Sequence, residues 1–396
     1  MNRFEFGLAE PSDDAVLRNL MAATPSGGKV VVSFRREPSY FDAAVVEGPF
    51  RQTIVARDRE SGCVAAVGDR SVRQRFVNGV PTPIGFLSNL RILPQYRNQS
   101  ILARGFRHLR CLHRDGRARL YLSTIAKGNQ VAASALTTGR ACLPRYHYAG
   151  DYHTAVIPLR KNPPLKKGGR GDSNPSREDQ IPCYPPFSKG EAGRNGVFVR
   201  EAKPEDVSRL IEFLNQSGQV RQFFPVYGVA DFFSASGSFR DLRESDILLT
   251  FRGSEIVGTL ACWNQIAFRQ TVVESYSTAV SWVRPLVNSW AQLRGAVTLP
   301  KAGEPFRFVS GALPLVKNDD PQIFEPLLQA ARSNVSDPRA EYLLIGLHER
   351  DPLRPVVEKY QTTIYSVGVY YVCWEEGESL RAQLDDRPPY LELGCL

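Results

Sequence analysis

The sequence is poor in the features that mark membrane, secreted and zinc-binding proteins. No apolar run approaches the length of a membrane span, and the first residues lack the charged-then-apolar pattern of a signal peptide. The seven cysteines form no Cys-x-x-Cys pair; they stand at positions 63, 111, 142, 183, 262, 373 and 395. We therefore expect a cytoplasmic protein with reduced thiols, no disulfide framework, no metal site and no membrane partner.

Length and composition predict a folded protein of more than one domain. Hydrophobic residues make up 42% and charged residues 23% of the 396 positions, as in a globular protein. A chain of this length exceeds what one ordinary core holds, so two or more domains are expected.

The net charge of +9 is concentrated in the first part of the chain. Residues 1–159 hold 22 Lys and Arg against 12 Asp and Glu, whereas residues 197–396 hold 20 against 25. Eight arginines and one carboxylate lie between positions 91 and 119. This excess indicates either a field that attracts an anionic ligand or a solvated helix face. No aromatic residues are interleaved with the basic ones and no groove-reading motif is present, so a nucleic-acid partner is not expected.

Residues 160–196 differ in composition from the rest of the chain. The segment is rich in Pro, Gly and charge and has almost no β-branched residues. It buries too little apolar surface to offset its ordering entropy, which predicts a flexible linker. The linker separates a first domain, residues 1–159, from a second domain, residues 197–396.

The two flanking parts repeat one order of predicted elements. Each begins with a short strand, the pattern Ala-x-Pro-x-Asp at positions 9–13 and 202–206, and an amphipathic helix. A hairpin follows in each, and Asn78-Gly79 predicts a second hairpin in the first part. A buried strand, a short helix and a strand that closes the unit come last. This order predicts an α/β fold of the α+β kind, with a mixed sheet and helices on both faces.

The second part contains one additional predicted helix, within residues 276–293. Apolar residues recur there at helical spacing: Val283, Leu286, Val287, Trp290 and Leu293. The pattern favours a helix packed on its own domain, and a lid or a partner-binding helix is the alternative.

Residues 84–105, IGFLSNLRILPQYRNQSILARG, combine an apolar strand, a short polar turn and the start of an arginine-rich helix. This order places free backbone N–H groups at a helix N-terminus, where a pyrophosphate binds. The first hypothesis for this segment is therefore a site for a phosphate-bearing cofactor.

The order of elements and this segment together resemble the GNAT superfamily of acyl-CoA-dependent N-acyltransferases. LRILPQYR matches the strand and the Pro-x-Tyr-Arg step of the family's central motif, and residues 129–132, NQVA, match a later Asn-x-x-Ala feature. The resemblance implies two GNAT-like domains joined by the linker, with acetyl-CoA or another acyl-CoA as cofactor. It covers motif and architecture over residues 1–159, and architecture alone over residues 197–396.

The resemblance also implies a set of cofactor-binding residues. The central strand and the loop after it would supply Leu90, Ile92, Arg97, Asn98, Gln99, Ser100, Ile101 and Leu102. Ser100 and Leu102 stand where the family usually has glycine or alanine, which let backbone amides approach the pyrophosphate. Asn129 resembles a residue that hydrogen-bonds the pantetheine arm, and its alternative role is a helix N-cap.

Amine acylation needs a general base and a donor for the oxyanion. The central strand, residues 84–93, contains no carboxylate. Glu37, Asp42 and Glu47, in the loop before the first hairpin, are candidate bases, and Glu47 is selected among them. A backbone N–H near Ile92 is the candidate donor for the oxyanion.

A general acid for the departing thiolate is the third requirement. The family usually supplies a Tyr seven residues after the Asn, and Leu136 occupies that position here. Tyr146 and Tyr148 are the candidates to replace it, with a packing role as the alternative.

The second part lacks an Arg-x-x-Gly-x-Gly loop, and Asp319 and Asp320 would repel a pyrophosphate there. The active site is therefore expected in the first domain, as that of an N-acetyltransferase in which the amine attacks directly within a ternary complex. The expected acceptor is a small-molecule or peptide amine. The alternative is a catalytically inactive tandem protein that uses the fold for binding or scaffolding, and the oligomeric state is open.

Overall fold

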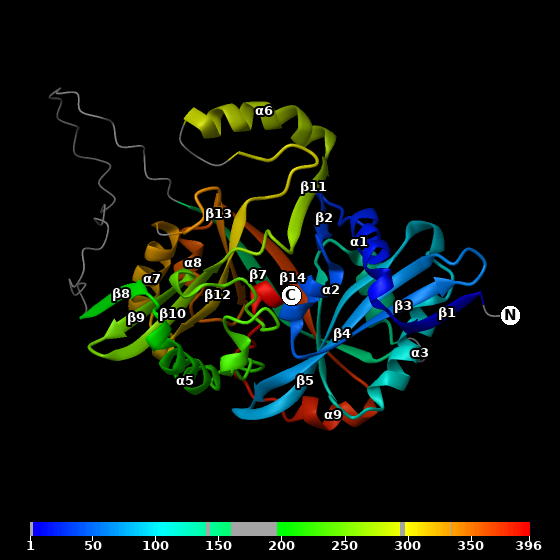
Figure 1. Ribbon diagram of the computed structural model, residues 1–396, viewed down its shortest axis with the longest axis horizontal. Coiled ribbons are helices and arrows are strands. Elements are labelled where there is room, and N and C mark those ends of the chain that lie inside the picture. Colours follow the sequence, from blue (N-terminus) through cyan, green and yellow to red (C-terminus); the bar gives the residue numbers. More distant parts are fainter. Residues whose placement is uncertain (1–2, 140–142, 160–195, 294–297, 334) are drawn as a thin grey trace.

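The computed structural model describes residues 3–139, 143–159, 196–293, 298–333 and 335–396 (Figure 1). Apart from Gly196, the predicted linker lies outside these residues.

The first part of the chain forms the elements predicted for it and, between its first helix and its first hairpin, one further strand and one further short helix. Its strands are β1 (Phe4–Leu8), β2 (Val30–Arg35), β3 (Phe50–Asp58), β4 (Val64–Val77), β5 (Val80–Ile92), β6 (Tyr121–Ala126) and β7 (Arg145–Pro158). Its α-helices are α1 (Asp14–Ala23), α2 (Tyr40–Ala44), α3 (Ile101–His113) and α4 (Gln130–Thr137). The second hairpin is confirmed: Asn78 and Gly79 join β4 to β5 with φ of 52° and 82°, as a tight hairpin turn requires.

The second part repeats this order without counterparts of β2 and α2, and it adds a strand and a helix midway and one helix at its end. Its strands are β8 (Val197–Glu201), β9 (Ile247–Arg252), β10 (Glu255–Trp263), β11 (Gln270–Tyr276), β12 (Phe308–Val316), β13 (Tyr342–His348) and β14 (Thr363–Cys373). Its α-helices are α5 (Val207–Gly218), α6 (Thr278–Leu293), α7 (Pro321–Ser333), α8 (Arg354–Glu358) and α9 (Glu375–Ala382).

Strands from both parts form one twelve-stranded sheet, in the order β1-β3-β4-β5-β6-β14-β7-β13-β12-β10-β9-β8. The pairs β5–β6 and β12–β13 are parallel and the other pairs are antiparallel, so the predicted mixed sheet is confirmed. Strands β2 and β11 pair separately as a two-stranded ribbon.

The two parts exchange their last strands. Strand β14 lies between β6 and β7, and β7 also pairs with β13. The expectation that each part closes its own sheet is therefore wrong. The last strand of the second part, β14, pairs with β6 and β7 of the first part, and the last strand of the first part, β7, pairs with β13 of the second. Periodicity identifies a strand but not its partner. The domain boundaries themselves stay a prediction.

Helices cover both faces of the sheet. On β3 and β4, Val55 and Val67 pack with Leu17 of α1, whereas the adjacent Ala56 and Ala66 pack with the first residue of α3. Successive strand residues face opposite sides, so α1 and α3 lie on opposite faces. We call these the α1 face and the α3 face.

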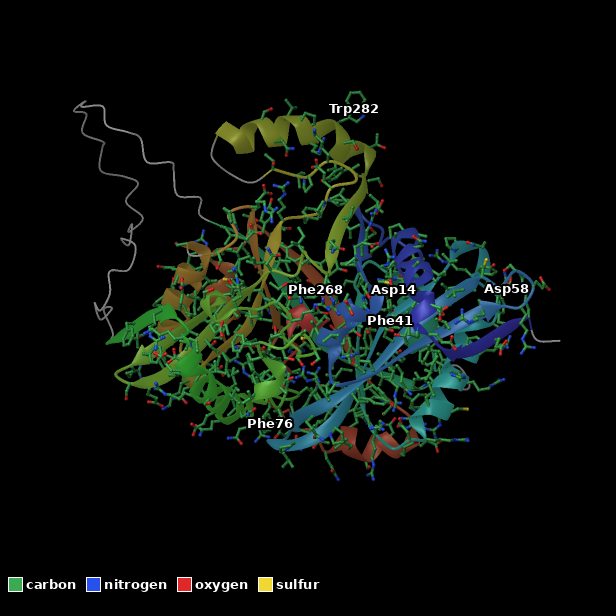
Figure 2. The ribbon with its side chains drawn as sticks, viewed as in Figure 1. Asp14, Phe41, Asp58, Phe76, Phe268 and Trp282 are labelled. Carbon is green, nitrogen blue, oxygen red and sulfur yellow. The ribbon has the colours of Figure 1, made fainter. Side chains whose placement is uncertain are left out.

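A hydrophobic core spans both parts of the chain. Phe76 of β4 belongs to the same buried cluster as Phe268, which lies between β10 and β11 (Figure 2). Leu210 of α5 and Leu249 of β9 are members of this cluster too. The parts are thus joined by packing as well as by strand exchange.

Helix α6 stands away from the body, at the end of the β2–β11 ribbon (Figure 1). The helix is confirmed. The favoured expectation that its apolar stripe packs on its own domain is wrong at Val283 and Leu286, which are 51% and 73% exposed, and the adjacent Trp282 is 80% exposed. The side chains of Val287, Trp290 and Leu293 lie outside the described residues. Periodicity specifies an apolar stripe without specifying what covers it. In the part of the chain that the structure describes, no helix combines the length and apolarity that crossing a membrane would take.

Candidate active site

Strands β5 and β6 separate partway along their length. Their parallel pairing runs from Gly85 opposite Tyr121 to Leu87 opposite Ser123, whereas β5 continues to Ile92. The Ser123 hydroxyl donates to the Leu87 carbonyl at 3.0 Å, at the last paired position. We call the opening beyond this point, along residues 88–92, the splay. Its free β5 edge offers backbone groups to which the amides of a ligand can add like another strand.

A β-bulge shapes the splay. Asn89 has a φ of 53°, and the pairing of β4 with β5 shifts register beside it. Asparagine tolerates the left-handed region better than most residues with a Cβ. The bulge turns the strand edge and brings the side chain of Asn89 against the α1 face, where it donates to Asp69 at 2.8 Å.

The loop between β5 and α3 leaves a helix N-terminus open. Asn98 and Ser100 have φ of 64° and 56°, so the loop adopts the left-handed backbone that glycine usually supplies. Helix α3 starts at Ile101, and the side chain of Ser100 makes no capping hydrogen bond. The first N–H groups of the helix are therefore available to an anion.

The other predicted cofactor residues surround this helix start. Arg97 is exposed and its Nε donates to the Ile92 carbonyl at 3.3 Å, while Gln99 donates to the Gln95 carbonyl at 2.9 Å. Leu102 packs into the core cluster of the α3 face. Its bulk therefore does not project into the loop, although it stands where the family usually has a small residue.

Asn129 caps α4. Its Oδ1 accepts from the backbone N–H of Ala132 at 3.1 Å, which is the alternative role that the sequence allowed. The residue is exposed, and a role toward a pantetheine arm stays a prediction.

The matching positions of the second part are occupied by its own carboxylates. Asp320 caps α7 by accepting from the backbone N–H of Gln322 at 2.8 Å. Leu313, with φ of 54°, marks the corresponding bulge in β12, and its N–H donates to Glu392 at 3.0 Å. An anion would have to displace both carboxylates, whereas the start of α3 in the first part has no side-chain cap.

Glu47 is buried beside the bulge. It lies after α2, is 4% exposed, and pairs with the guanidinium of Arg36. Arg269, from the second part, donates to it at 2.8 Å, and Asn89 donates at 3.3 Å. Burial raises the pKa of Glu47, and the two guanidiniums oppose that rise. The structure thus brings the predicted base to the splay, but with its charge already compensated.

Asp69 is a carboxylate at the splay that the sequence did not single out. It lies on β4 opposite Ser88 of β5. Its Oδ2 accepts from the Tyr40 hydroxyl at 2.7 Å. Its Oδ1 is buried and has no hydrogen-bond partner among the described residues. The sequence feature that could have identified Asp69 is an acidic residue in the strand that pairs with the central strand.

The two tyrosine candidates occupy different environments. Tyr146 packs against Phe106 of α3, with ring centroids 6.4 Å apart, and burial raises its pKa. The side chain of Ser123, at the start of the splay, interacts with it and opposes part of this rise. Tyr148 is 58% exposed, and its hydroxyl donates to Asp151 at 2.6 Å. Tyr146 therefore lies at the splay, and Tyr148 is engaged away from it.

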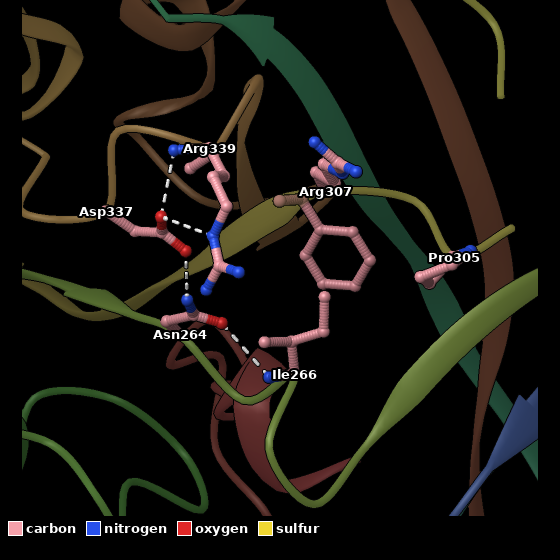
Figure 3. Close-up of a pocket in the computed structure, with 8 residues that line it drawn as sticks. Asn264, Ile266, Pro305, Arg307, Asp337 and Arg339 are labelled. Carbon is pink, nitrogen blue, oxygen red and sulfur yellow. Dashed lines mark hydrogen bonds and ion pairs between the residues drawn. The ribbon is translucent and has the colours of Figure 1, made fainter.

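A cavity of about 230 Å³ lies elsewhere (Figure 3). Its lining comprises Asn264, Ile266, Pro305, Arg307, Phe308, Asp337, Arg339 and Ala340. It sits where β12 and β13 begin, and the Asp337 carboxylate accepts from Asn264 at 2.7 Å. Ligands of such sheets bind at the carboxyl ends of parallel strands, which is where β5 and β6 splay.

The described architecture is that of the GNAT fold. The N-myristoyltransferase of Saccharomyces cerevisiae with bound myristoyl-CoA superposes with a TM-score of 0.54 at 10% identity, covering 94% of this chain and 79% of that one. A GCN5-related glucosamine N-acetyltransferase region of a fungal multi-domain GH3 beta-N-acetylglucosaminidase gives 0.53 at 11% identity, covering 92% and 38%. No protein-family model and no curated protein sequence matches the chain. The chain thus has the GNAT fold, as the sequence resemblance implied, with both parts in one sheet.

Proposed function

We propose that this protein is an acyl-CoA-dependent N-acyltransferase with its active site at the splay of the first part. The observation that carries the proposal is the uncapped N-terminus of α3 at the end of a split pair of parallel strands. The shared fold supports it, because the superposed yeast enzyme is a transferase solved with an acyl-CoA. Within this class we propose acetyl transfer to an amine by direct attack in a ternary complex.

Groups on the two faces of the sheet have different roles in binding and in proton transfer. The N-terminus of α3 and the loop at residues 97–100 hold phosphate, and the free backbone edge of Leu90 and Ile92 holds the pantetheine amides. Bound acyl-CoA supplies the activated thioester. A backbone N–H of the bulge stabilises negative charge on the carbonyl oxygen as the amine nitrogen bonds to carbon.

Proton transfers complete the reaction. On the α1 face, Asp69 Oδ1 accepts the proton that the attacking amine loses. On the α3 face, Tyr146 donates a proton to the sulfur as the carbon–sulfur bond breaks, and its raised pKa keeps the hydroxyl protonated at neutral pH. Glu47 holds Arg36 and Asn89 in place and is proposed as a positioning residue. Asp69 is proposed as the base.

Acetyl-CoA is expected to stabilise the protein against heat. A ligand that binds only the folded state adds about 2.7 kcal/mol at a concentration 100 times its Kd. Thermal melts with millimolar acetyl-CoA, and separately with CoA, are therefore expected to shift the Tm upward by several degrees. An unchanged Tm with both ligands would refute the enzyme and leave the binding or scaffolding alternative.

Tyr146→Phe is expected to lower kcat about 100-fold while acetyl-CoA still binds, since only the proton donor is lost. Tyr148→Phe is the matched control, because its hydroxyl is already bonded to Asp151, and its kcat is expected to stay within twofold of the wild type. Steady-state thiol release with an active acceptor measures both variants. A larger loss in Tyr148→Phe would transfer the role of the acid to Tyr148.

A further inference from the structure

Arg91 lies at the splay, beside the proposed base. It follows the left-handed Asn89 by two positions on β5. The next residue, Ile92, packs with Ile101 on the α3 face, so the side chain of Arg91 extends toward the α1 face, where Asp69 lies.

The charge of Arg91 is influenced by groups from two separate segments. Its titratable neighbours are Arg36 and Tyr40, from the segment after β2, and Tyr365 of β14. Tyr365 is 47% exposed, and Arg91 itself is partly buried. Both residues therefore keep some contact with solvent.

The positive charge of Arg91 lacks a carboxylate partner. The neighbouring Arg36 pairs with Glu47 and Asp69. Arg91 forms no ion pair with any residue that the structure describes, and its hydrogen bond goes to an adjacent backbone carbonyl at 3.2 Å. Partial burial lowers the pKa of Arg91, so its charged form is incompletely solvated. An anionic group on a ligand would compensate it with short, charge-assisted hydrogen bonds.

Building on the acyltransferase function above, we propose that the acceptor is an amine that carries a carboxylate, such as an amino acid, and that Arg91 binds this carboxylate. The planar guanidinium matches a carboxylate through two parallel hydrogen bonds. The phosphates of CoA are assigned to the start of α3 on the other face and do not compete for it. A strand rises about 3.3 Å per residue, so Arg91 lies roughly 7 Å along β5 from the bulge, within reach of an acceptor whose amine is at Asp69.

Matched acceptor pairs test the inference. A panel of amino acids, each paired with its α-amide, is assayed with acetyl-CoA; the amide keeps the amine and the side chain and removes the negative charge. The wild type is expected to show at least a tenfold higher kcat/KM for the acid. Arg91→Gln is expected to lose at least tenfold on the acid, mainly through KM, and to leave the amide unchanged. Arg91→Lys should restore part of the preference, because it keeps the charge.

Arg252→Gln is the matched control, since Arg252 is exposed on β9 in the second part, and it is expected to behave as the wild type. Equal use of acids and amides by the wild type overturns the inference, as does an equal loss on both in Arg91→Gln. A lost acetyl-CoA thermal shift in Arg91→Gln overturns it too, by assigning Arg91 to the cofactor. Failure of the wild type to bind acetyl-CoA, or to acylate any amine of the panel, refutes the function proposed above and this inference with it.

Discussion

Ser100→Asp is expected to weaken CoA binding by at least about 100-fold. The substitution places a carboxylate at the open start of α3, and two like charges 4 Å apart repel by about 4 kcal/mol at the effective dielectric of a protein surface. Asp320 already occupies the start of α7 in this way. Calorimetric titration with CoA measures the loss.

The same substitution should leave the unliganded protein intact, because aspartate is among the best N-cap residues and complements the helix dipole. An unchanged or raised Tm without ligand therefore separates loss of the site from unfolding. Ser100→Gly is the matched control: glycine suits the φ of 56° and adds no charge, so it is expected to bind CoA at least as well as the wild type. Wild-type affinity in Ser100→Asp would show that the phosphates bind elsewhere.

Asp69→Asn is expected to lower kcat by roughly 100- to 10,000-fold, the range for loss of a general base, with acetyl-CoA binding unchanged. The amide keeps the size of the side chain and can still accept from Tyr40, but it cannot take a proton from the amine. Rapid-quench or steady-state measurement of acyl transfer, together with the acetyl-CoA thermal shift, checks both halves of the prediction.

Glu47→Gln distinguishes the proposed base from the one selected in the sequence. It leaves Arg36 and Arg269 buried without their common carboxylate, and breaking a buried pair costs about 3–5 kcal/mol. We therefore expect a lower urea midpoint and a kcat of the folded fraction that falls less than in Asp69→Asn, because the amide oxygen can still accept from Arg36 and Asn89. A folded Glu47→Gln without activity, beside an active Asp69→Asn, would return the role of base to Glu47.

In the second part of the chain, carboxylates of the chain itself occupy the positions that match the helix start and the bulge of the first part. Asp320 satisfies the start of α7, and Glu392 binds the N–H of Leu313 at the bulge. Backbone N–H groups that are hydrogen-bonded to carboxylates in this way stabilise the fold and are not free to bind a cofactor. The second part nevertheless contacts the candidate site of the first part, because Arg269 donates to Glu47 beside the bulge.

Local chemistry explains why the sequence predicted some of the site well. The Pro-x-Tyr-Arg step and the polar turn before Ile101 specify a helix start within a few residues, and the structure places that start where it was expected. The resemblance assigns Leu102 to the cofactor-binding residues. In the structure its side chain packs against the core cluster, because helical spacing decides which side chains point inward. Asn129 had two possible roles, and its capping of α4 follows from the same short-range geometry.

The carboxylate at the splay illustrates what short-range patterns miss. The central strand lacks an acidic residue, so the sequence predicts the base in the loop that contains Glu47. Asp69 reaches the same place from the adjacent strand, because antiparallel pairing sets it opposite Ser88. That register depends on a bulge at Asn89, whose position no periodicity reveals.

The sequence by itself determined the order of helices and strands, the hairpin at Asn78-Gly79 and the open start of α3, since each depends on backbone preferences and side chains a few residues apart. Only the tertiary structure decided that β14 enters between β6 and β7, and that Arg269 pairs with Glu47 across 222 positions of the chain. Hydrogen bonding between strands is generic to all backbones, so the choice of partner follows from packing both parts around a shared core.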